Sequence, residues 1–239
     1  MRRAITVLAL GVALTSASSA RADSQEESAA VSAYSLDRPH TLVDVGLGAL
    51  TLPAAKLCTS LSCTTTDLTL LIALRHLYKW NRHWGVGAGI SWGLRPGTDD
   101  ATVHGPDGVS VARTHARNYF SVAGNARYYP VAEDQWHLWV GLTSGIIVVS
   151  DRYALSEKGT SIVGPKNVTV ASEGFMAGLG FGFDWSLARN WTVGAWTTQM
   201  IWHFPATRSC AQTVGDCATV SGSLFSFETG LSVTYRVRM

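Results

Sequence analysis

The segment Trp84–Leu94, WGVGAGISWGL, separates its residues into two kinds at alternate positions. Its even-numbered positions are Trp, Val, Ala, Ile, Trp and Leu, and its odd-numbered positions are Gly, Gly, Gly, Ser and Gly. Because successive side chains of a strand point to opposite faces, this pattern predicts a strand with one apolar face and one nearly bare face. A helix would scatter both kinds of residue around its axis.

The bare face distinguishes two classes of β protein. In a soluble β-sandwich or adhesin domain, the face opposite the core carries charged side chains that meet water. Here that face carries glycine. We therefore interpret the apolar face as facing lipid, and the glycine face as leaving room for large side chains inside a barrel.

The N-terminus has the pattern of an export signal. Arg2 and Arg3 precede the apolar run Ala4–Leu14, and Ala20-Arg21-Ala22 forms an A-x-A cleavage site. The run is too short for a membrane anchor, which needs about 20 apolar residues. We predict a cleaved signal peptide at residues 1–22, a flexible periplasmic lead at 23–39 and an outer-membrane β-barrel at 40–239.

The composition agrees with a membrane barrel. The chain has 19 Lys and Arg and 17 Asp and Glu, and removal of Arg2, Arg3 and Arg21 with the signal leaves 16 basic residues and a net charge near −1. This balance gives no reason to expect binding to nucleic acid. Charged residues make up only 15% of the chain, and no further apolar run is long enough for a spanning helix. A closed β-barrel is the other fold that satisfies every backbone polar group in lipid.

Alternation of this kind recurs along the chain and predicts eight antiparallel strands. Short turns follow the second, fourth and sixth strands, and long segments follow the first, third, fifth and seventh, as in outer-membrane barrels with short periplasmic turns and long outer loops. The predicted strands are about 40–52, 67–80, 84–94, 114–129, 136–150, 173–187, 191–204 and 223–239.

The strand at 191–204 has an ambiguous phase. Trp196 and Gln199 lie on opposite faces of a regular strand. Whichever face is assigned to lipid, these two residues contradict the assignment. A β-bulge between them would resolve the conflict.

Two further patterns locate side chains in the predicted barrel. Trp84, Trp136 and Trp191 each follow a short turn, which predicts an aromatic girdle at the periplasmic interface. Strands four apart face each other across a narrow lumen, so we expect the glycines of 84–94 to oppose bulky residues of 191–204.

Seven charged residues of both signs fall on inward positions. A charge in a narrow lumen must be paired to be tolerated. The network is interpreted first as a salt-bridge plug that closes the barrel, and alternatively as a selectivity ring or gate of a narrow pore. Its members are Asp44, Arg75, Lys79, Arg127, Asp184, Glu228 and Arg236.

The four cysteines form two close pairs in the predicted loops. In an exported protein we expect disulfides, and Cys58 with Cys63 and Cys210 with Cys217 is the simplest of three connectivities. The spacings do not match a CxxC zinc site, so no metal and no cofactor is predicted.

The strand pattern resembles the small eight-stranded outer-membrane proteins of the OmpA, OmpX and OmpW type, over about residues 40–239. The last strand alternates through Tyr235, Val237 and Met239, like the signal that the barrel-assembly machinery reads, although Met239 stands where that signal usually has Phe or Trp. The resemblance implies an outer-membrane location, contact with outer-membrane lipid and lipopolysaccharide, and an outer-loop partner of unknown identity. A periplasmic peptidoglycan-binding domain is not found after the barrel.

An enzyme is the less favoured alternative. Some eight-stranded barrels modify lipid A with a His and a Ser near the outer surface, and His104, His115 and His203 are the candidates here. No local His-x-Ser pattern places a base beside a nucleophile. We therefore predict a non-enzymatic barrel with a structural or surface-interaction role, with an OmpW-like narrow pore for small solutes as the main alternative.

Overall fold

The computed structural model describes residues 39–52, 57–59, 62–64, 67–95, 99–104, 110–155, 167–205, 210, 217–218 and 220–238. The signal peptide, almost all of the periplasmic lead and Met239 lie outside these residues, so these predictions stay untested. In the described ranges no helix is long and apolar enough to cross a membrane.

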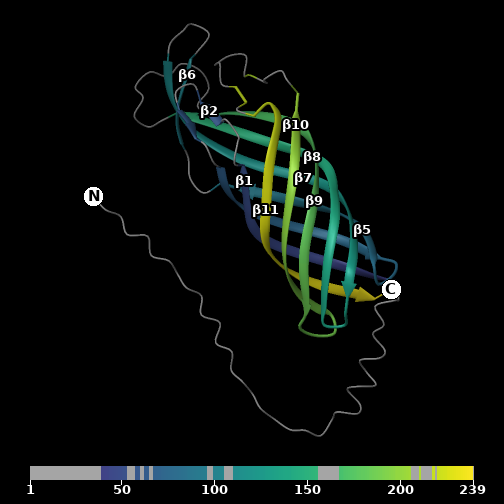
Figure 1. The fold of residues 1–239 in the computed structure, drawn as a ribbon. Helices are drawn as coiled ribbons and strands as arrows, with labels where there is room; N and C mark the ends of the chain where they lie inside the picture. The colour runs from purple at the N-terminus through teal and green to yellow at the C-terminus, as the bar shows by residue number, and fades with distance from the viewer. Residues whose placement is uncertain are drawn as a thin grey trace, which may run out of the picture. The chain divides into compact units, whose positions relative to one another are not determined.

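Eight long strands and three short ones make up the fold (Figure 1). The short strands are β2 (Leu57–Thr59), β3 (Ser62–Thr64) and β6 (Asp99–His104). The long strands are β1 (His40–Leu52), β4 (Asp67–Lys79), β5 (Trp84–Leu94), β7 (Ser110–Ala132), β8 (Trp136–Leu155), β9 (Asn167–Ser186), β10 (Trp191–Phe204) and β11 (Gly222–Arg238).

The long strands close into an antiparallel up-and-down barrel. Each one pairs with its neighbours in the chain, β5 pairs with β7, and β1 pairs with β11 to complete the wall. The strand register is staggered around the barrel. If the paired residues are traced from Trp84 through each strand once around the wall, the path returns to β5 at Leu94 and not at Trp84. A stagger of this size corresponds to strands tilted by about 40° from the barrel axis, as in transmembrane barrels.

The outside of the barrel is apolar. On β5 the even-numbered residues face outward and the glycines face inward, as the sequence predicts. Large apolar side chains elsewhere on the wall are strongly exposed, including Phe175 at 71% and Leu231 at 69%. The predicted fold class, an eight-stranded antiparallel transmembrane β-barrel, is confirmed.

The two ends of the barrel differ. At one end, here called the turn end, short turns join β4 to β5, β7 to β8 and β9 to β10. At the other, the loop end, β7, β8 and β9 continue beyond Leu94, where β5 ends opposite Asn118. Part of the segment predicted as a loop at 96–113 is thus β-structure, because β6 pairs with the start of β7. Beyond the lipid the outward positions need not be apolar, so the alternation is hard to see in the sequence.

The phase of β10 is regular. Trp196 is buried inside the barrel and Gln199 faces outward, and the pairing of β10 with β9 and β11 runs without a shift. The predicted bulge in this strand is therefore wrong. A register shift occurs between Tyr128 and Val131, where β7 pairs with β8 near the turn end.

Candidate functional site: the barrel interior

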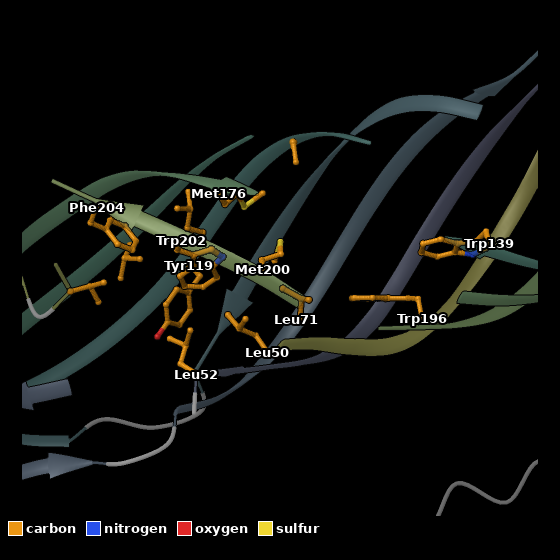
Figure 2. Close-up of a cluster of buried hydrophobic side chains, with 14 of the residues drawn as sticks. Leu50, Leu52, Leu71, Tyr119, Trp139, Met176, Trp196, Met200, Trp202 and Phe204 are labelled. Carbon is orange, nitrogen blue, oxygen red and sulfur yellow. The ribbon is translucent and has the colours of Figure 1, made fainter. Parts of the chain in front are cut away.

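Toward the loop end, a group of apolar side chains packs together inside the barrel (Figure 2). The rings of Tyr119 and Trp202 lie 5.6 Å apart between centroids, and Phe204 meets Trp202 edge to face at 6.4 Å. The described side chains in this group, here called the apolar cluster, are Leu50, Leu52, Leu71, Tyr119, Val149, Met176, Met200, Trp202 and Phe204, each at most 4% exposed.

Toward the turn end, three cations lie against three aromatic rings. The guanidinium of Arg75 lies 4.1 Å from the centre of the Trp196 ring, and that of Arg127 lies 4.0 Å from the centre of Trp139. The ammonium of Lys79 lies 3.6 Å from the centre of the Tyr129 ring. These distances are those of cation–π contacts, which gain strength when the cation is desolvated. We call these three pairs the cation–aromatic layer.

Asp44, a member of the predicted charge network, accepts two hydrogen bonds. Its Oδ1 accepts a hydrogen bond from Arg75 Nη1 at 3.0 Å, and its Oδ2 accepts one from Thr234 Oγ1 at 3.1 Å. Asp44 is 1% exposed, so this charge-assisted contact is shielded from water. The pair joins β1, β4 and β11 inside the barrel.

A small cavity separates the apolar cluster from the cation–aromatic layer. Arg75, Arg127 and Glu228 line it, together with Met176 and Met200 from the apolar side. It leaves about 40 Å³ for the centres of water-sized molecules, which is room for about three waters. Glu228 is 8% exposed and makes no hydrogen bond or ion pair with the described residues, although Arg75 is near enough to interact with its charge.

The wall opposite Glu228 is polar but uncharged. Ser91 and Ser121 share a hydrogen bond of 2.5 Å between their hydroxyl oxygens, and Thr143 donates one of 2.9 Å to Asn125 Oδ1. All four residues line the cavity. Hydroxyl and amide groups of this kind can hold water but do not neutralise a carboxylate.

The structure places the predicted network inside the barrel without joining it into one cluster. Asp44, Arg75, Lys79, Arg127, Asp184 and Glu228 are buried or nearly so, and Arg236 is partly buried. One ion pair, Asp44 with Arg75, links two members in the described part of the chain. Arg75, Lys79 and Arg127 instead contact aromatic rings, which the predicted charge network did not include.

The side chains that lie over the inward glycines are not the ones predicted. A Cβ at Gly85 would meet Lys79, and one at Gly93 would meet Tyr119, so the strands next to β5 fill this space and not β10. Gly182 likewise lies against Trp139 of the neighbouring β8. In a barrel with strongly tilted strands, side chains lean over adjacent strands, so comparing opposite strands chose the wrong partners.

The three predicted girdle residues lie at the turn end on the outside of the wall. Trp84 is 46% and Trp191 is 49% exposed, and Trp136 is partly buried. Trp84 packs on Tyr128 and Trp191 on Tyr235, each with 4.8 Å between ring centroids. Their contact with a membrane interface stays a prediction.

A buried polar cluster at the loop end was missed by the sequence interpretation. His115 Nε2 lies 2.7 Å and Arg117 Nε lies 2.9 Å from the same Asp151 oxygen, and all three side chains are at most 2% exposed. The inward alternation of Arg113, His115 and Arg117 on β7 is the signal that could have found it.

Tyr153 connects this cluster to a disulfide-bonded cysteine. Cys210 and Cys217 form the predicted disulfide. Tyr153 Oη, whose ring stacks on His115 at 4.9 Å, donates a hydrogen bond of 2.8 Å to the Cys217 carbonyl. Cys58 and Cys63 are opposite each other in the β2–β3 pair, and their side chains lie outside the described residues, so that disulfide stays a prediction.

Neither described candidate histidine lies in a complete catalytic triad. His115 has Asp151 but no serine hydrogen bond, and His203 Nδ1 lies 2.9 Å from Ser223 Oγ without an acidic partner among the described contacts. The side chain of His104 is outside the described part. No group of three or more potential metal ligands occurs in the described residues.

Comparisons with known proteins give likeness of shape at low identity. Neisserial surface protein A has a TM-score of 0.49 and 11% identity, over 82% of this chain and 96% of that one. Ail of Yersinia pestis, in complex with the heparin analogue sucrose octasulfate, has a TM-score of 0.49 and 14% identity, over 84% and 99%. The outer membrane protein OprG of Pseudomonas aeruginosa has a TM-score of 0.42 and 11% identity, over 86% and 99%. The sequence matches no protein-family model and no curated protein.

Proposed function

We propose that this chain is an outer-membrane barrel with a closed lumen and a structural or surface-interaction role. The apolar cluster is the observation that carries the proposal. Its rings and aliphatic side chains pack on one another inside the barrel, and none of them carries a charge that would hold ions. A solute would have to displace buried side chains from several strands to pass.

The location follows from the wall and its girdle. Trp84, Trp136 and Trp191 at the turn end are suited to the periplasmic interface, so the loop end would face outward. The apolar wall would contact membrane lipid, with lipopolysaccharide in the outer leaflet. The last strand, with Tyr235, Val237 and Met239, would be read by the barrel-assembly machinery during insertion.

The surface role is supported by the part of the barrel beyond the lipid. There β6, β7, β8 and β9 form a four-stranded sheet that continues past the end of β5. The buried His115–Asp151–Arg117 cluster links β7 to β8 in this sheet, and Tyr153 of β8 is hydrogen-bonded to Cys217. A sheet that is held rigid by these contacts outside the membrane is suited to binding a macromolecule.

A narrow pore is the second candidate. The cavity with Arg75, Arg127 and Glu228 favours it, because charged groups that line a water-sized space are the elements of a selectivity site. In this alternative the apolar cluster would act as a gate that opens.

Single-channel recording in planar bilayers tests the proposal. We expect the refolded protein to show no openings above the baseline, and the Trp202→Ala variant, which removes the largest ring of the apolar cluster, to show leak. Regular openings of the unmodified protein, with ion selectivity lost in Glu228→Gln, would overturn closure and support the pore. Slower migration of boiled than unboiled samples on denaturing gels would show beforehand that each protein is folded as a barrel.

A further inference from the structure

The lipid-facing side of β10 differs from that of its neighbours. Outward positions on β9 and β11 carry large apolar residues, among them Phe181 and Phe227. Between them, β10 presents Ala195, Thr197 and Gln199 in succession. Thr197 is opposite Thr229 of β11, so the polar patch comprises Thr197, Gln199 and Thr229, and we call it the β10 patch.

Gln199 lies within the apolar belt. It is eight residues along β10 from the girdle residue Trp191, or about 26 Å along the strand and about 20 Å along the axis of a barrel tilted by about 40°. The apolar belt of such barrels is about 25 Å tall. Ile201, Phe225 and Phe175, all exposed and apolar, lie still closer to the loop end.

The amide of Gln199 has no hydrogen-bond partner among the described residues. Its paired neighbours on the two sides are Leu179 and Phe227, which offer no side-chain polar group. Thr229 differs, because its hydroxyl donates a hydrogen bond of 3.2 Å to the Trp196 carbonyl. An amide in hydrocarbon without a partner is costly, so the position is explained by a partner that supplies one.

We propose that the β10 patch is the contact site for a second copy of this chain in the membrane. An amide both donates and accepts, so Gln199 can pair with Gln199 of a second copy across a two-fold axis along the membrane normal. The small Ala195 and Thr197 let the two walls approach, as small residues do between membrane segments. The rings of Phe181 and Phe227 flank the contact. The proposal requires the membrane-spanning fold and does not depend on whether the lumen conducts.

Cysteine cross-linking in native outer membranes tests the geometry. Thr197→Cys lies six residues from Trp191, and Val122→Cys, an outward control on β7, lies six residues from Tyr128. We expect a disulfide-linked dimer from Thr197→Cys, and none from Val122→Cys or from the chain with its native cysteines alone. Equal dimer yields from the two variants, or none from Thr197→Cys, would overturn the proposal.

Sedimentation equilibrium in density-matched detergent tests the chemistry. Gln199→Leu keeps the size of the side chain and removes the amide, so we expect self-association about 3- to 20-fold weaker than in the unmodified protein. Ile201→Leu, the next outward position on β10, is the matched control and should leave the association constant unchanged. An unmodified protein that stays monomeric, or a Gln199→Leu variant that associates as tightly, contradicts the proposal. A monomer that retains lipid in native mass spectrometry only when Gln199 is present would assign the patch to lipid instead.

Discussion

Toward the loop end of the barrel, the side chains of the apolar cluster pack on one another, whereas toward the turn end three cations lie against three aromatic rings. Both halves are densely filled, but their stability has different sources. The apolar cluster gains from burial and close packing. The cation–aromatic layer must compensate for the desolvation of buried charges.

Each half of the interior is therefore sensitive to a different kind of substitution. Removing volume from the apolar cluster leaves a cavity that neighbouring strands cannot collapse to fill. Removing Asp44 leaves Arg75 of the cation–aromatic layer buried without its counter-charge, while removing both partners of this ion pair costs much less. The following substitutions separate these two kinds of loss.

The largest effect is expected from Trp202→Ala in the apolar cluster. Trp202 is 1% exposed and packs on Tyr119 and Phe204, so truncation should lower the free energy of unfolding by about 4 kcal/mol. Urea titration of the protein in lipid vesicles measures the loss. Trp92→Ala is the control, because Trp92 faces outward at 39% exposure and lipid can fill the space that it leaves. Equal losses at the two positions would show that the apolar cluster is not tightly packed.

A somewhat smaller loss is expected from Asp44→Ala in the turn-end half. It removes the carboxylate that accepts hydrogen bonds from Arg75 and Thr234, and should lower the free energy of unfolding by about 3 kcal/mol. Adding Arg75→Met to Asp44→Ala should recover most of that loss, because neither member of the ion pair then remains buried without the other. If the double variant is less stable than the single one, contacts of Arg75 with Trp196 or Glu228 outweigh its ion pair.

The barrel itself could be predicted from the sequence because lipid acts on every outward residue of the wall. Alternation on Trp84–Leu94 and its counterparts gave the strand number, the faces and the positions of the short turns. The inward charges were also placed on the correct face. These features depend on the period of a strand and need no knowledge of side-chain partners.

The contacts inside the barrel could not be predicted in the same way. Gly182 was assigned to the correct face, but which ring fills its space depends on strand tilt and stagger, which alternation does not contain. The cation–π contact of Lys79 with Tyr129 was missed because charges were matched only with charges. Gln199 made the phase of β10 ambiguous because it is a polar residue on a lipid-facing position, and such conflicts between local pattern and fold often mark functional positions.

A moderate effect is expected from Gly182→Ala, which tests packing within the cation–aromatic layer. The added Cβ would overlap the Trp139 ring, which also carries Arg127, and should lower the free energy of unfolding by about 2 kcal/mol. Gly124→Ala is the matched control on the outer face, where the nearest atom to an added Cβ is 3.8 Å away, so no loss is expected. A stable Gly182→Ala variant would mean that Trp139 moves freely, and the layer would then be loosely packed like a hydrated channel.

The smallest effect is expected from Lys79→Met, which removes a buried charge without removing volume. The variant loses the cation–π contact with Tyr129, which is worth about 2 kcal/mol for a desolvated cation. It also no longer has to bury a cation that forms no ion pair in the described part of the chain. These two terms have opposite signs, so the free energy of unfolding should change by less than about 1 kcal/mol. Urea titration in the same vesicles checks this. A loss as large as that of Asp44→Ala would show that Lys79 has a counter-charge, and the turn-end half would then be held by ion pairs and not by contacts of cations with rings.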